Sequence, residues 1–252
     1  MISNLLRQKI AVISGASRGI GRGIALRFAE EGASLVLICL KNEHRLKEVS
    51  KEAQSLGVRT LSIIGDVSDV SFCESVLERT ISEFGRADIL VNCAGIITRT
   101  PFEDLSLVDW HRVIDVNLHG TFHLCRMFLP TMRMQMYGKV INVTSQMAFL
   151  PHPGASPSYE VSKAAISALT RHLSLQYAKY NVCINSIAPG SIDTDLPKSM
   201  SQEARSKLEH AIPMRRLGDT EEVGDCALFL ASSMSDYITG TTLHINGGSL
   251  ML

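Results

Sequence analysis

Short apolar runs alternate with longer stretches of helical period along the whole chain. Most of these runs carry apolar residues on both faces, which is typical of parallel strands that helices cover on either side. They predict strands at Lys9–Ser14, Ser34–Leu40, Thr60–Gly65, Ala87–Asn92, Lys139–Thr144, Val182–Ala188 and Thr242–Ile245. The alternation therefore predicts an α/β fold over residues 1–252: a single doubly wound, Rossmann-type domain whose mostly parallel sheet of about seven strands has helices on both faces.

Glycine marks the ends of two predicted helices. A pattern with a period of about 3.6 residues runs over Gly21–Glu31 and stops at Gly32, and a second runs over Glu43–Leu56 and stops at Gly57. Right-handed crossovers between such helices and parallel strands place ligands outside the carboxyl ends of the strands. The segment 190–216 is rich in Pro, Ser and Met and is long for a plain connection, so we expect a mobile substrate lid that contains a short helix.

The composition excludes several classes of function. Lysine plus arginine balances aspartate plus glutamate at 25 each, so no bulk field attracts nucleic acid or an anionic membrane. No apolar stretch approaches the ~20 residues that cross a bilayer. The six cysteines are scattered without paired spacing, mostly inside apolar runs, and are typical of buried thiols in a reducing compartment. We therefore expect a soluble, cytoplasmic protein that binds neither nucleic acid nor a membrane.

A glycine-rich turn follows the first predicted strand directly. Its sequence, Gly15-Ala16-Ser17-Arg18-Gly19-Ile20-Gly21, has GxxxGxG spacing and leads into a helix. Glycines let the backbone approach a pyrophosphate, and the start of the helix directs free N–H groups and partial positive charge at it. A glycine turn by itself is more often plain turn chemistry, and the strand–turn–helix setting is what favours a dinucleotide site. The cofactor-binding residues expected in this turn are Gly15, Ser17, Arg18, Gly19, Ile20 and Gly21.

Tyr159 and Lys163 are four residues apart in a helical pattern that continues to Tyr180. This spacing places both side chains on one face of the helix, and Ser145 precedes them by about one loop. Free tyrosine titrates near pH ~10, and a neighbouring ammonium together with an oxidised nicotinamide ring would favour the phenolate. We therefore expect a phenol that moves a proton. The alternative in which Ser145 only caps a turn stays open.

Further motifs accompany the glycine turn and the Tyr–Lys pair. They are Asp66-Val67, Asn92-Cys93-Ala94-Gly95, Asn117, Pro189-Gly190 with Thr194, and Asn246-Gly247-Gly248. Together these segments resemble the short-chain dehydrogenase/reductase family over essentially the whole chain. Two departures are small: Ser14 stands for the usual threonine and Cys93 for the second asparagine. The resemblance implies an enzyme that transfers a hydride between a nicotinamide and a ketone or secondary alcohol.

The resemblance implies four catalytic residues, Ser145, Tyr159, Lys163 and Asn117. Tyr159 would be the general acid in reduction and the base in oxidation. Ser145 would hydrogen-bond the carbonyl oxygen where charge develops. Lys163 would also bind the nicotinamide ribose, and Asn117 would anchor a water that relays protons to the lysine.

The step from Ser145 to Tyr159 is one residue longer than is usual in the family. Taking Gln146 as the counterpart of the family serine would restore the usual step. However, Thr144-Ser145 ends the predicted strand as the family serine does. We therefore keep Ser145 and place the extra residue in the loop His152–Pro157.

The rest of the cofactor site is also implied by the resemblance. The Asp66 equivalent contacts adenine, the segment Asn92–Gly95 supports the sheet edge beside the adenosine ribose, and the Thr194 equivalent holds the nicotinamide carboxamide. The cofactor-binding residues expected beyond the glycine turn are Lys41, Asp66, Val67, Asn92, Ala94, Gly95, Tyr159, Lys163, Pro189, Gly190, Ile192 and Thr194.

The end of the second predicted strand indicates which nicotinamide is used. Proteins that bind NAD(H) place an acidic residue there for the ribose 2′-hydroxyl. Here Leu40 and Lys41 occupy that place, and the cations Lys41 and Arg18 would both reach a 2′-phosphate. The sequence thus predicts NADP(H), with NAD(H) as the alternative if Lys41 is only a solvated loop lysine.

The substrate is less sharply defined. Segments 212–218 and 237–248 resemble 3-oxoacyl-[acyl-carrier-protein] reductases, which dock the acidic carrier protein on arginines. The matching positions here are Met136 and Tyr180, with Arg133 and Lys179 only nearby. Segment 94–102 instead resembles sugar-acid and polyol dehydrogenases. The sequence slightly favours a 3-oxoacyl thioester, with acyl-carrier protein as a candidate partner; Arg99 is a solvated loop residue or a contact for a carboxylate substrate.

Three further expectations concern assembly, catalysis and metals. The resemblance implies a homotetramer in which helices around Asn117–Met134 and Ser162–Lys179 pack across one interface. A dinucleotide sensor or scaffold is the remote alternative, and a sensor would bind NADPH without any substrate-dependent oxidation. His119 and His123 share a helix face, but no third ligand follows them, so we expect no metal site.

Overall fold

The structure, a computed structural model of the full chain, describes residues 4–152, 154–195 and 200–252. Seven strands form one sheet in the order β3-β2-β1-β4-β5-β6-β7, and every neighbouring pair is parallel. The strands are β1 (Ile10–Ser14), β2 (Ser34–Cys39), β3 (Thr60–Ile64), β4 (Ile89–Asn92), β5 (Gly138–Val143), β6 (Val182–Pro189) and β7 (Thr242–Ile245). The single doubly wound α/β domain is therefore confirmed, with a fully parallel sheet where a mostly parallel one was expected.

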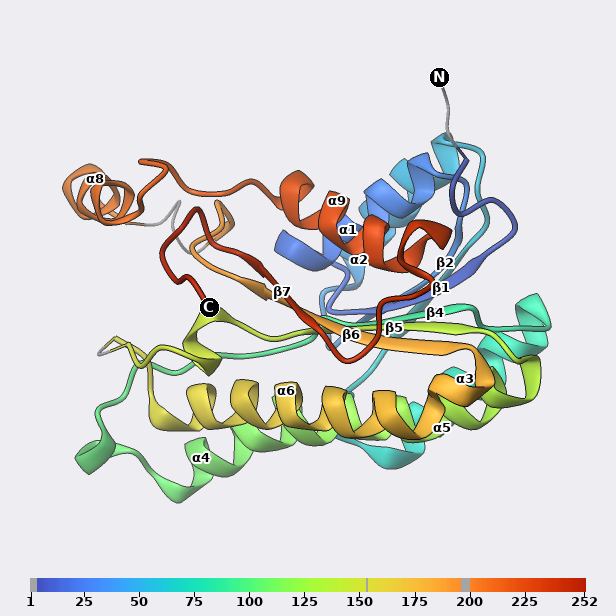
Figure 1. Ribbon diagram of the computed structural model, residues 1–252, viewed down its shortest axis with the longest axis horizontal. Helices are drawn as coiled ribbons and strands as arrows, with labels where there is room; N and C mark the ends of the chain where they lie inside the picture. Colours follow the sequence, from blue (N-terminus) through green and yellow to red (C-terminus); the bar gives the residue numbers. More distant parts are fainter. Residues whose placement is uncertain (1–3, 153, 196–199) are drawn as a thin grey trace.

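Helices cover both faces of this sheet (Figure 1). One face carries α1 (Gly19–Glu30), α2 (Glu43–Ser55) and α9 (Thr220–Ala231). The other face carries α3 (Val70–Phe84), α4 (Leu107–Ile114), α5 (Gly120–Gln135) and α6 (Pro157–Tyr177). Short 3₁₀ turns follow at η1 (Phe102–Asp104), η3 (Gln146–Ala148), η4 (Ala178–Tyr180) and η5 (Ser233–Ser235). Among the described helices, none is long and apolar enough to cross a membrane.

The core is divided by the sheet into two apolar layers. Successive side chains of a strand point to opposite faces, so Ile13 packs in the layer under α1 and α9, whereas Val12 packs in the layer over α3 and α5. Phe28 of α1 and Phe128 of α5 are fully buried, one in each layer. Because helices cover both faces of the sheet, the side chains on both sides of the strands are mostly apolar. The resulting apolar runs are what predicted the strands from the sequence.

Both helix ends predicted from glycine are confirmed. α1 ends at Glu30 and α2 at Ser55, and the glycines that follow, Gly32 and Gly57, have φ angles of +86° and +87°. This left-handed conformation is strained for other residues and typical of the position after a helix.

The segment 190–216 contains the predicted short helix, α8 (Gln202–Ala211). Arg205 of α8 binds the Asp193 carboxylate with both terminal nitrogens, at 3.0 and 3.2 Å, which ties the helix to the chain that leaves β6. In Figure 1, α8 extends beyond the edge of the sheet. Residues 196–199 of the predicted lid lie outside the described residues.

Candidate active site

The glycine-rich turn joins the carboxyl end of β1 to α1. Gly15 and Gly19 have φ angles of +70° and +54°, which favour glycine. A Cβ on Gly15 would lie 2.9 Å from the backbone of Ala94, and a Cβ on Gly21 would overlap the carbonyl oxygen of Gly15. Arg18, the N-cap of α1, makes no capping hydrogen bond with its side chain. The first N–H groups of α1 are therefore available to an anion.

A cavity of about 440 Å³ opens beside this turn. Its lining comprises Ser17, Arg18, Gly19, Arg22, Arg45, Glu48, Val49, Glu52, Asp193, Thr194, Asp195 and Thr220. Thr194 lies against the turn, since a Cβ on Gly19 would be 3.4 Å from the Thr194 methyl carbon. Left-handed glycines, available N–H groups and arginines fit the phosphate groups of a nicotinamide dinucleotide.

The Ser14 hydroxyl connects the turn to the end of β4. Its Oγ accepts hydrogen bonds from the N–H groups of Cys93 at 3.0 Å and Ala94 at 3.1 Å, and it donates to the Val91 carbonyl at 3.4 Å. Serine thus makes this link in place of the family threonine. Asn92 is buried, and its Nδ2 donates to Oδ1 of Asn142 at 2.8 Å. These contacts hold the Asn92–Gly95 segment beside Gly15.

Asp66 follows β3, at the adenine end of the expected site. Its Oδ1 accepts from the N–H and the hydroxyl of Ser68, at 2.9 and 2.7 Å, and its Oδ2 accepts from Arg112 of α4 at 2.9 Å. Partial burial would raise the pKa of Asp66, but the hydrogen bonds from Ser68 and Arg112 outweigh burial and hold the pKa below its usual range. Arg112 was missed by sequence analysis, since no motif singles it out.

Ser145, Tyr159 and Lys163 come together at the carboxyl end of β5. Ser145 ends the link from β5, is buried, and lies at the N-cap of η3, where its Oγ accepts from the N–H of Met147 at 3.1 Å. Tyr159 and Lys163 lie in the first two turns of α6, and the Lys163 Nζ is 5.8 Å from the centre of the Tyr159 ring. Ser145 therefore caps a turn and also lies beside the Tyr159 phenol. The capping role and the expected catalytic role of this serine do not exclude each other.

The pKa values of both Tyr159 and Lys163 are shifted in the structure. Burial raises the pKa of Tyr159 above its ordinary value, while a hydrogen bond with Ser145 acts in the opposite direction. Burial also lowers the pKa of Lys163 from 10.5 to about 8. Burial is the largest influence on both pKa values, and the expectation that the ammonium together with an oxidised nicotinamide ring favours the phenolate stays a prediction.

Asn117 lies in a π-helical turn, η2 (Asp115–His119), that leads into α5. Its Oδ1 accepts from the N–H of Ile96 at 2.8 Å, and its Nδ2 donates to the Ile96 carbonyl and to the Ser162 hydroxyl, both at 3.0 Å. A Cβ on Gly95 would lie 3.3 Å from the Asn117 Oδ1 and 3.5 Å from the Lys163 Nζ. Gly95 thus lets the amide and the ammonium approach the same point of the backbone.

The loops after β5 and β6 meet beside Ser145. The N–H of Gly190 donates to the Ile245 carbonyl at 2.8 Å, and a Cβ on Gly190 would lie 2.9 Å from both the Asn246 Cα and the Gln146 Oε1. Pro189 and Ile192 are buried on either side. In the part of the chain that the structure describes, the Gln146 Oε1 is buried and has no hydrogen-bond partner. The Gln146 amide oxygen thus lies against Gly190, one residue after Ser145, and the sequence raised Gln146 only as an alternative to Ser145.

Two expected cofactor contacts do not join this cluster. Lys41 is exposed beyond the end of β2 and does not line the cavity beside the glycine turn. Val67 is buried against Gly120, and its carbonyl accepts from the Cys73 thiol at 3.2 Å. The loop His152–Pro157, where we placed the extra residue, includes Pro153, which lies outside the described residues.

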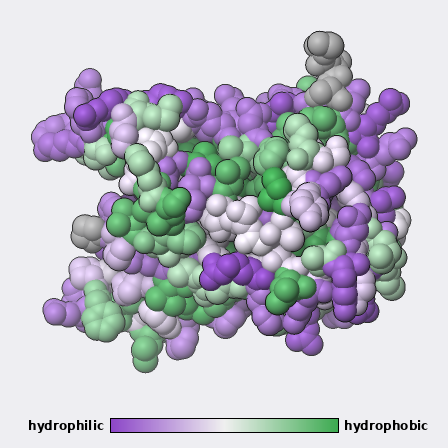
Figure 2. Space-filling model, viewed as in Figure 1, coloured by the Kyte–Doolittle hydropathy of each residue, from purple (hydrophilic) through white to green (hydrophobic). Residues whose placement is uncertain are grey.

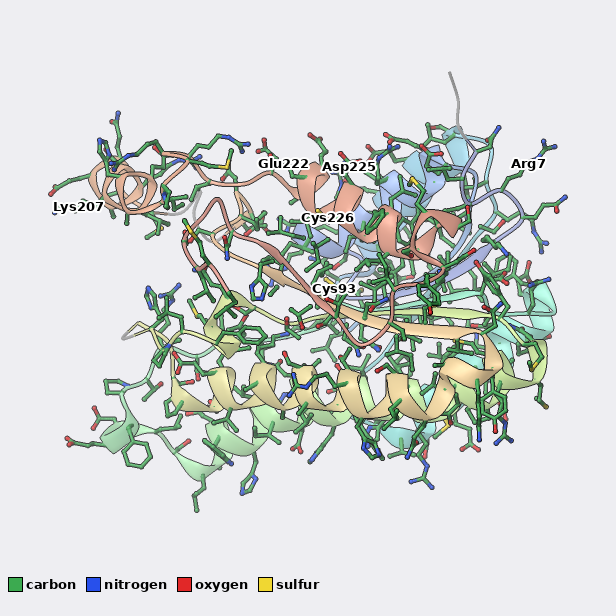
Figure 3. All side chains as sticks on the ribbon, viewed as in Figure 1. Arg7, Cys93, Lys207, Glu222, Asp225 and Cys226 are labelled. Carbon is green, nitrogen blue, oxygen red and sulfur yellow. The ribbon has the colours of Figure 1, made fainter. Side chains whose placement is uncertain are left out.

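The histidine pair has local partners. His119 Nδ1 lies 2.9 Å from the Asp115 Oδ1, and His123 Nδ1 lies 3.4 Å from the Val67 carbonyl oxygen. Among residues 4–152, 154–195 and 200–252, no group of three or more histidine, cysteine or acidic side chains is arranged to hold a metal ion. Cys93, labelled in Figure 3 between the two helical layers, faces Lys163, and burial raises the pKa of its thiol to about 11.

Comparisons with known proteins show which proteins this chain is similar to. A family model described as enoyl-(acyl carrier protein) reductase matches residues 15–249. The 3-oxoacyl-[acyl-carrier-protein] reductase FabG of Staphylococcus epidermidis is 34% identical over 243 residues, which cover 96% of this chain and 99% of that protein.

Two solved structures are similar over the whole of this chain. A 3-oxoacyl-[acyl-carrier protein] reductase from Brucella melitensis has a TM-score of 0.94 and 32% identity, with 94% of that chain covered. A protein from Agrobacterium tumefaciens, provisionally assigned as a gluconate dehydrogenase, has a TM-score of 0.93, also 32% identity, and all of that chain covered. The match over residues 15–249, the identity with the FabG protein and the geometry of the site lead to one conclusion: the chain belongs to the short-chain dehydrogenase/reductase family.

Proposed function

We propose that this oxidoreductase, which acts on CH–OH and C=O groups with a nicotinamide dinucleotide, is an NADP(H)-dependent 3-oxoacyl thioester reductase, with 3-oxoacyl-[acyl-carrier protein] as its substrate. The single observation that carries the proposal is the group of buried Ser145, buried Lys163 and half-buried Tyr159 at the carboxyl end of β5. When bound, the reduced nicotinamide would supply the hydride.

Tyr159 is the proton donor in this proposal. Because burial raises the pKa of Tyr159, the phenol is neutral at physiological pH and holds a proton for the oxygen of a reacting carbonyl. Ser145 lies next to the phenol and would donate its hydroxyl hydrogen to the same oxygen as charge develops there. The phenolate that remains after the transfer would be stabilised by the Lys163 ammonium.

Lys163 and Asn117 would prepare the site for this step. The Lys163 Nζ donates to the Val143 carbonyl at 2.8 Å, which fixes the ammonium beside the phenol. Asn117 is held by Ile96 and by Ser162, the residue before the lysine. We propose that Lys163 also binds the nicotinamide ribose and that Asn117 anchors a proton-relaying water.

The preference for NADP(H) is supported by the charges around the glycine turn. Arg18 lines the cavity beside the turn, Lys41 lies exposed after β2, and Leu40 stands where NAD(H) proteins place a carboxylate. A 2′-phosphate would bring about two negative charges to these cations. Asp66, Asn92–Gly95 and Thr194 would hold the adenine, the ribose and the carboxamide.

Two cations, Arg133 near the end of α5 and Lys179 after α6, support an acidic carrier protein as partner. The Arg133 guanidinium lies 5.8 Å and the Lys179 Nζ 5.2 Å from the centre of the Tyr180 ring, and Asn181 Nδ2 donates to the Met136 carbonyl at 3.2 Å. The two positions that carry arginines in carrier-protein reductases are thus side by side here, and each has a cation next to it. The relatives named as 3-oxoacyl-[acyl-carrier-protein] reductases favour the same substrate.

A sugar-acid dehydrogenase is the second candidate, and Arg99 is the observation that favours it. Arg99 is exposed after β4, and its Nη1 donates to the Gly154 carbonyl at 3.1 Å, which holds the guanidinium over the loop that precedes Tyr159. A cation at this place would suit a carboxylate substrate. The similarity to the Agrobacterium tumefaciens protein agrees with this candidate.

Assembly and the lid belong to the same proposal. We propose a homotetramer, because α5 and α6 expose large apolar side chains, with Met134 at 75% and Leu175 at 82% exposure. Figure 2 shows further apolar surface around the carboxyl end of the chain, where Met251 and Leu252 are exposed. We also propose that segment 190–216 closes over the substrate. The six cysteines are free thiols, which suits the reducing cytoplasm in which we expect the enzyme to work.

Two substrates tested side by side decide between the candidates. The assay follows NADPH oxidation with an acetoacetyl thioester and with a panel of keto-sugar acids, and NADH is the control cofactor. We expect turnover of the thioester with NADPH. Turnover of the sugar acids alone would transfer the assignment to the second candidate, and nucleotide binding without turnover of any ketone would indicate a sensor.

A further inference from the structure

One carboxylate binds two arginines from separate elements beside the glycine turn. The Asp195 Oδ2 lies 2.8 Å from Nη1 of Arg45, in the first turn of α2, and 3.5 Å from Nη1 of Arg18, the N-cap of α1. All three side chains are partly exposed and line the cavity of about 440 Å³. Chain segments far apart in sequence thus converge on a single oxygen atom.

Other charged side chains of the cavity have partners of their own. Arg22 binds Glu52 at 2.7 Å, and Asp193 binds Arg205. The hydrogen bond from Arg45 is the main cause that holds the pKa of Asp195 below its usual range, with Arg18 adding to it, so the carboxylate is charged at neutral pH. Asp195 therefore neutralises part of the positive charge of Arg18 and Arg45.

An oxygen atom between two guanidinium groups is also the arrangement in which arginines bind a phosphate. We propose that Arg45 is a further residue of the 2′-phosphate site and that Asp195 occupies this site in competition with the phosphate, so that Asp195 sets the affinity for NADP(H) but not for NAD(H). The inference rests on the proposed NADP(H) function. The inference adds two groups to Arg18 and Lys41: the Arg45 cation from α2 and the Asp195 anion from the chain after β6.

If Asp195 competes with the 2′-phosphate, Asp195→Asn should raise the affinity for NADPH. The amide keeps the shape of the side chain but no longer carries the charge that the phosphate must displace. NADPH should therefore bind more tightly to the variant, by about 3- to 10-fold, which is the range expected for two exposed ion pairs. NADH lacks the 2′-phosphate, so its dissociation constant should stay within about twofold. The gain should shrink at high salt, which screens exposed charges.

The test measures the dissociation constants of NADPH and NADH by calorimetry on the full chain. The variants are Asp195→Asn, Arg45→Gln and the two combined, and a thermal midpoint for each confirms folding. Arg45→Gln should weaken NADPH by about 3- to 10-fold and leave NADH unchanged. In the double variant, removal of Asp195 should gain less than it does alone, because one of its two partners is missing.

Asp225→Asn is the matched control. Asp225 accepts from Arg27 of α1 at 2.6 Å, so the change removes the same charge from a similar exposed pair. Figure 3 shows Asp225 on α9, and neither partner lines the cavity. This control should change neither dissociation constant.

The outcomes distinguish a failure of the proposed competition from a failure of the proposed activity. An NADPH-to-NADH affinity ratio that Asp195→Asn leaves unchanged or lowers would overturn the competition, even if ketone turnover is intact. A ratio that rises as expected in a protein that reduces no ketone would retain the inference and refute the proposed activity. A native protein that binds neither nucleotide would overturn both.

Discussion

Lys163 is the residue at which the proposed activity opposes the stability of the fold. It is 4% exposed, and burial lowers its pKa from 10.5 to about 8. At ~1.4 kcal/mol for each pH unit, keeping the ammonium charged in the folded state costs about 3 kcal/mol at neutral pH. Lys163→Met removes that cost with a side chain of similar length. It also leaves the Val143 carbonyl without its donor, which costs about 1 to 2 kcal/mol. The variant should therefore be more stable than the native enzyme at pH 7 by about 1 to 2 kcal/mol.

The sign of this difference should change with pH. The pKa of Lys163 is lower in the folded state, so between about pH 8 and pH 10.5 the unfolded chain binds more protons than the folded chain. The free energy of unfolding of the native enzyme therefore gains from Lys163 as the pH rises through this window. The penalty is complete below about pH 8 and absent above 10.5. At the alkaline end the native amine still donates to Val143, and the variant should be the less stable protein.

Urea unfolding at several pH values measures the difference directly. The fluorescence of Trp110, the one tryptophan of the chain, reports unfolding, and midpoints with their slopes give the free energies. Lys51→Met in α2 is the control, because Lys51 is exposed and undergoes the same chemical change. A free-energy difference between native and Lys163→Met enzyme that does not vary with pH would refute the reasoning. Substrate turnover should also be lost in the variant if the proposed role of the ammonium is correct.

Three further predictions concern single side chains. Tyr159→Phe should lower turnover by about 10²- to 10⁴-fold with NADPH binding intact, because the proton donor is lost; a stopped assay measures it, and retained turnover would remove Tyr159 from that role. Lys41→Ala should weaken NADPH by about 3- to 10-fold more than NADH in a binding titration, and equal losses would contradict the 2′-phosphate contact. Gly21→Ala forces a Cβ onto the Gly15 carbonyl oxygen, so it should destabilise the protein by about 1 to 3 kcal/mol and abolish nucleotide binding, whereas Gly57→Ala, whose Cβ meets nothing within 4 Å, should spare binding. Thermal midpoints and calorimetry check this pair, and intact binding in Gly21→Ala would show that the turn has room to move.

The fold was predictable because the apolar pattern of each strand matches its position in a sheet that is covered on both faces. β7 was predicted with its observed bounds, β5 is shifted by one residue at both ends, and the other strands differ by one or two residues at one end. Runs such as Ser34–Cys39 are apolar on both sides because helices cover both faces of the sheet. The helix ends at Gly32 and Gly57 were also predictable, because the left-handed φ angle at these positions favours glycine.

Contacts between distant segments could not be predicted in the same way. Arg45 and Asp195 are 150 positions apart, and Arg112 and Asp66 are 46 apart. Nothing in the composition of α2 or α4 distinguishes these arginines from solvated ones. The direction of the Tyr159 pKa shift was beyond prediction for a related reason: the motif places Lys163 near the phenol but does not fix how far the phenol is removed from water.

Burial is the largest cause acting on the pKa values of both Tyr159 and Lys163. Burial makes the Tyr159 phenol hold its proton and makes the Lys163 ammonium hold its proton weakly. Cys93 faces the lysine, but burial raises the pKa of its thiol to about 11, so the thiol is neutral and provides no counter-ion. In the described part of the chain, Lys163 forms no salt bridge and donates to the Val143 carbonyl. In the proposed reaction Tyr159 would give its proton to a substrate oxygen, and the phenolate would become the anion that the buried ammonium lacks. The same desolvation that penalises each charge alone would then strengthen the pair. We therefore propose that burial keeps the acid protonated until a substrate takes the proton, and that the lysine lowers the energy of the state that follows.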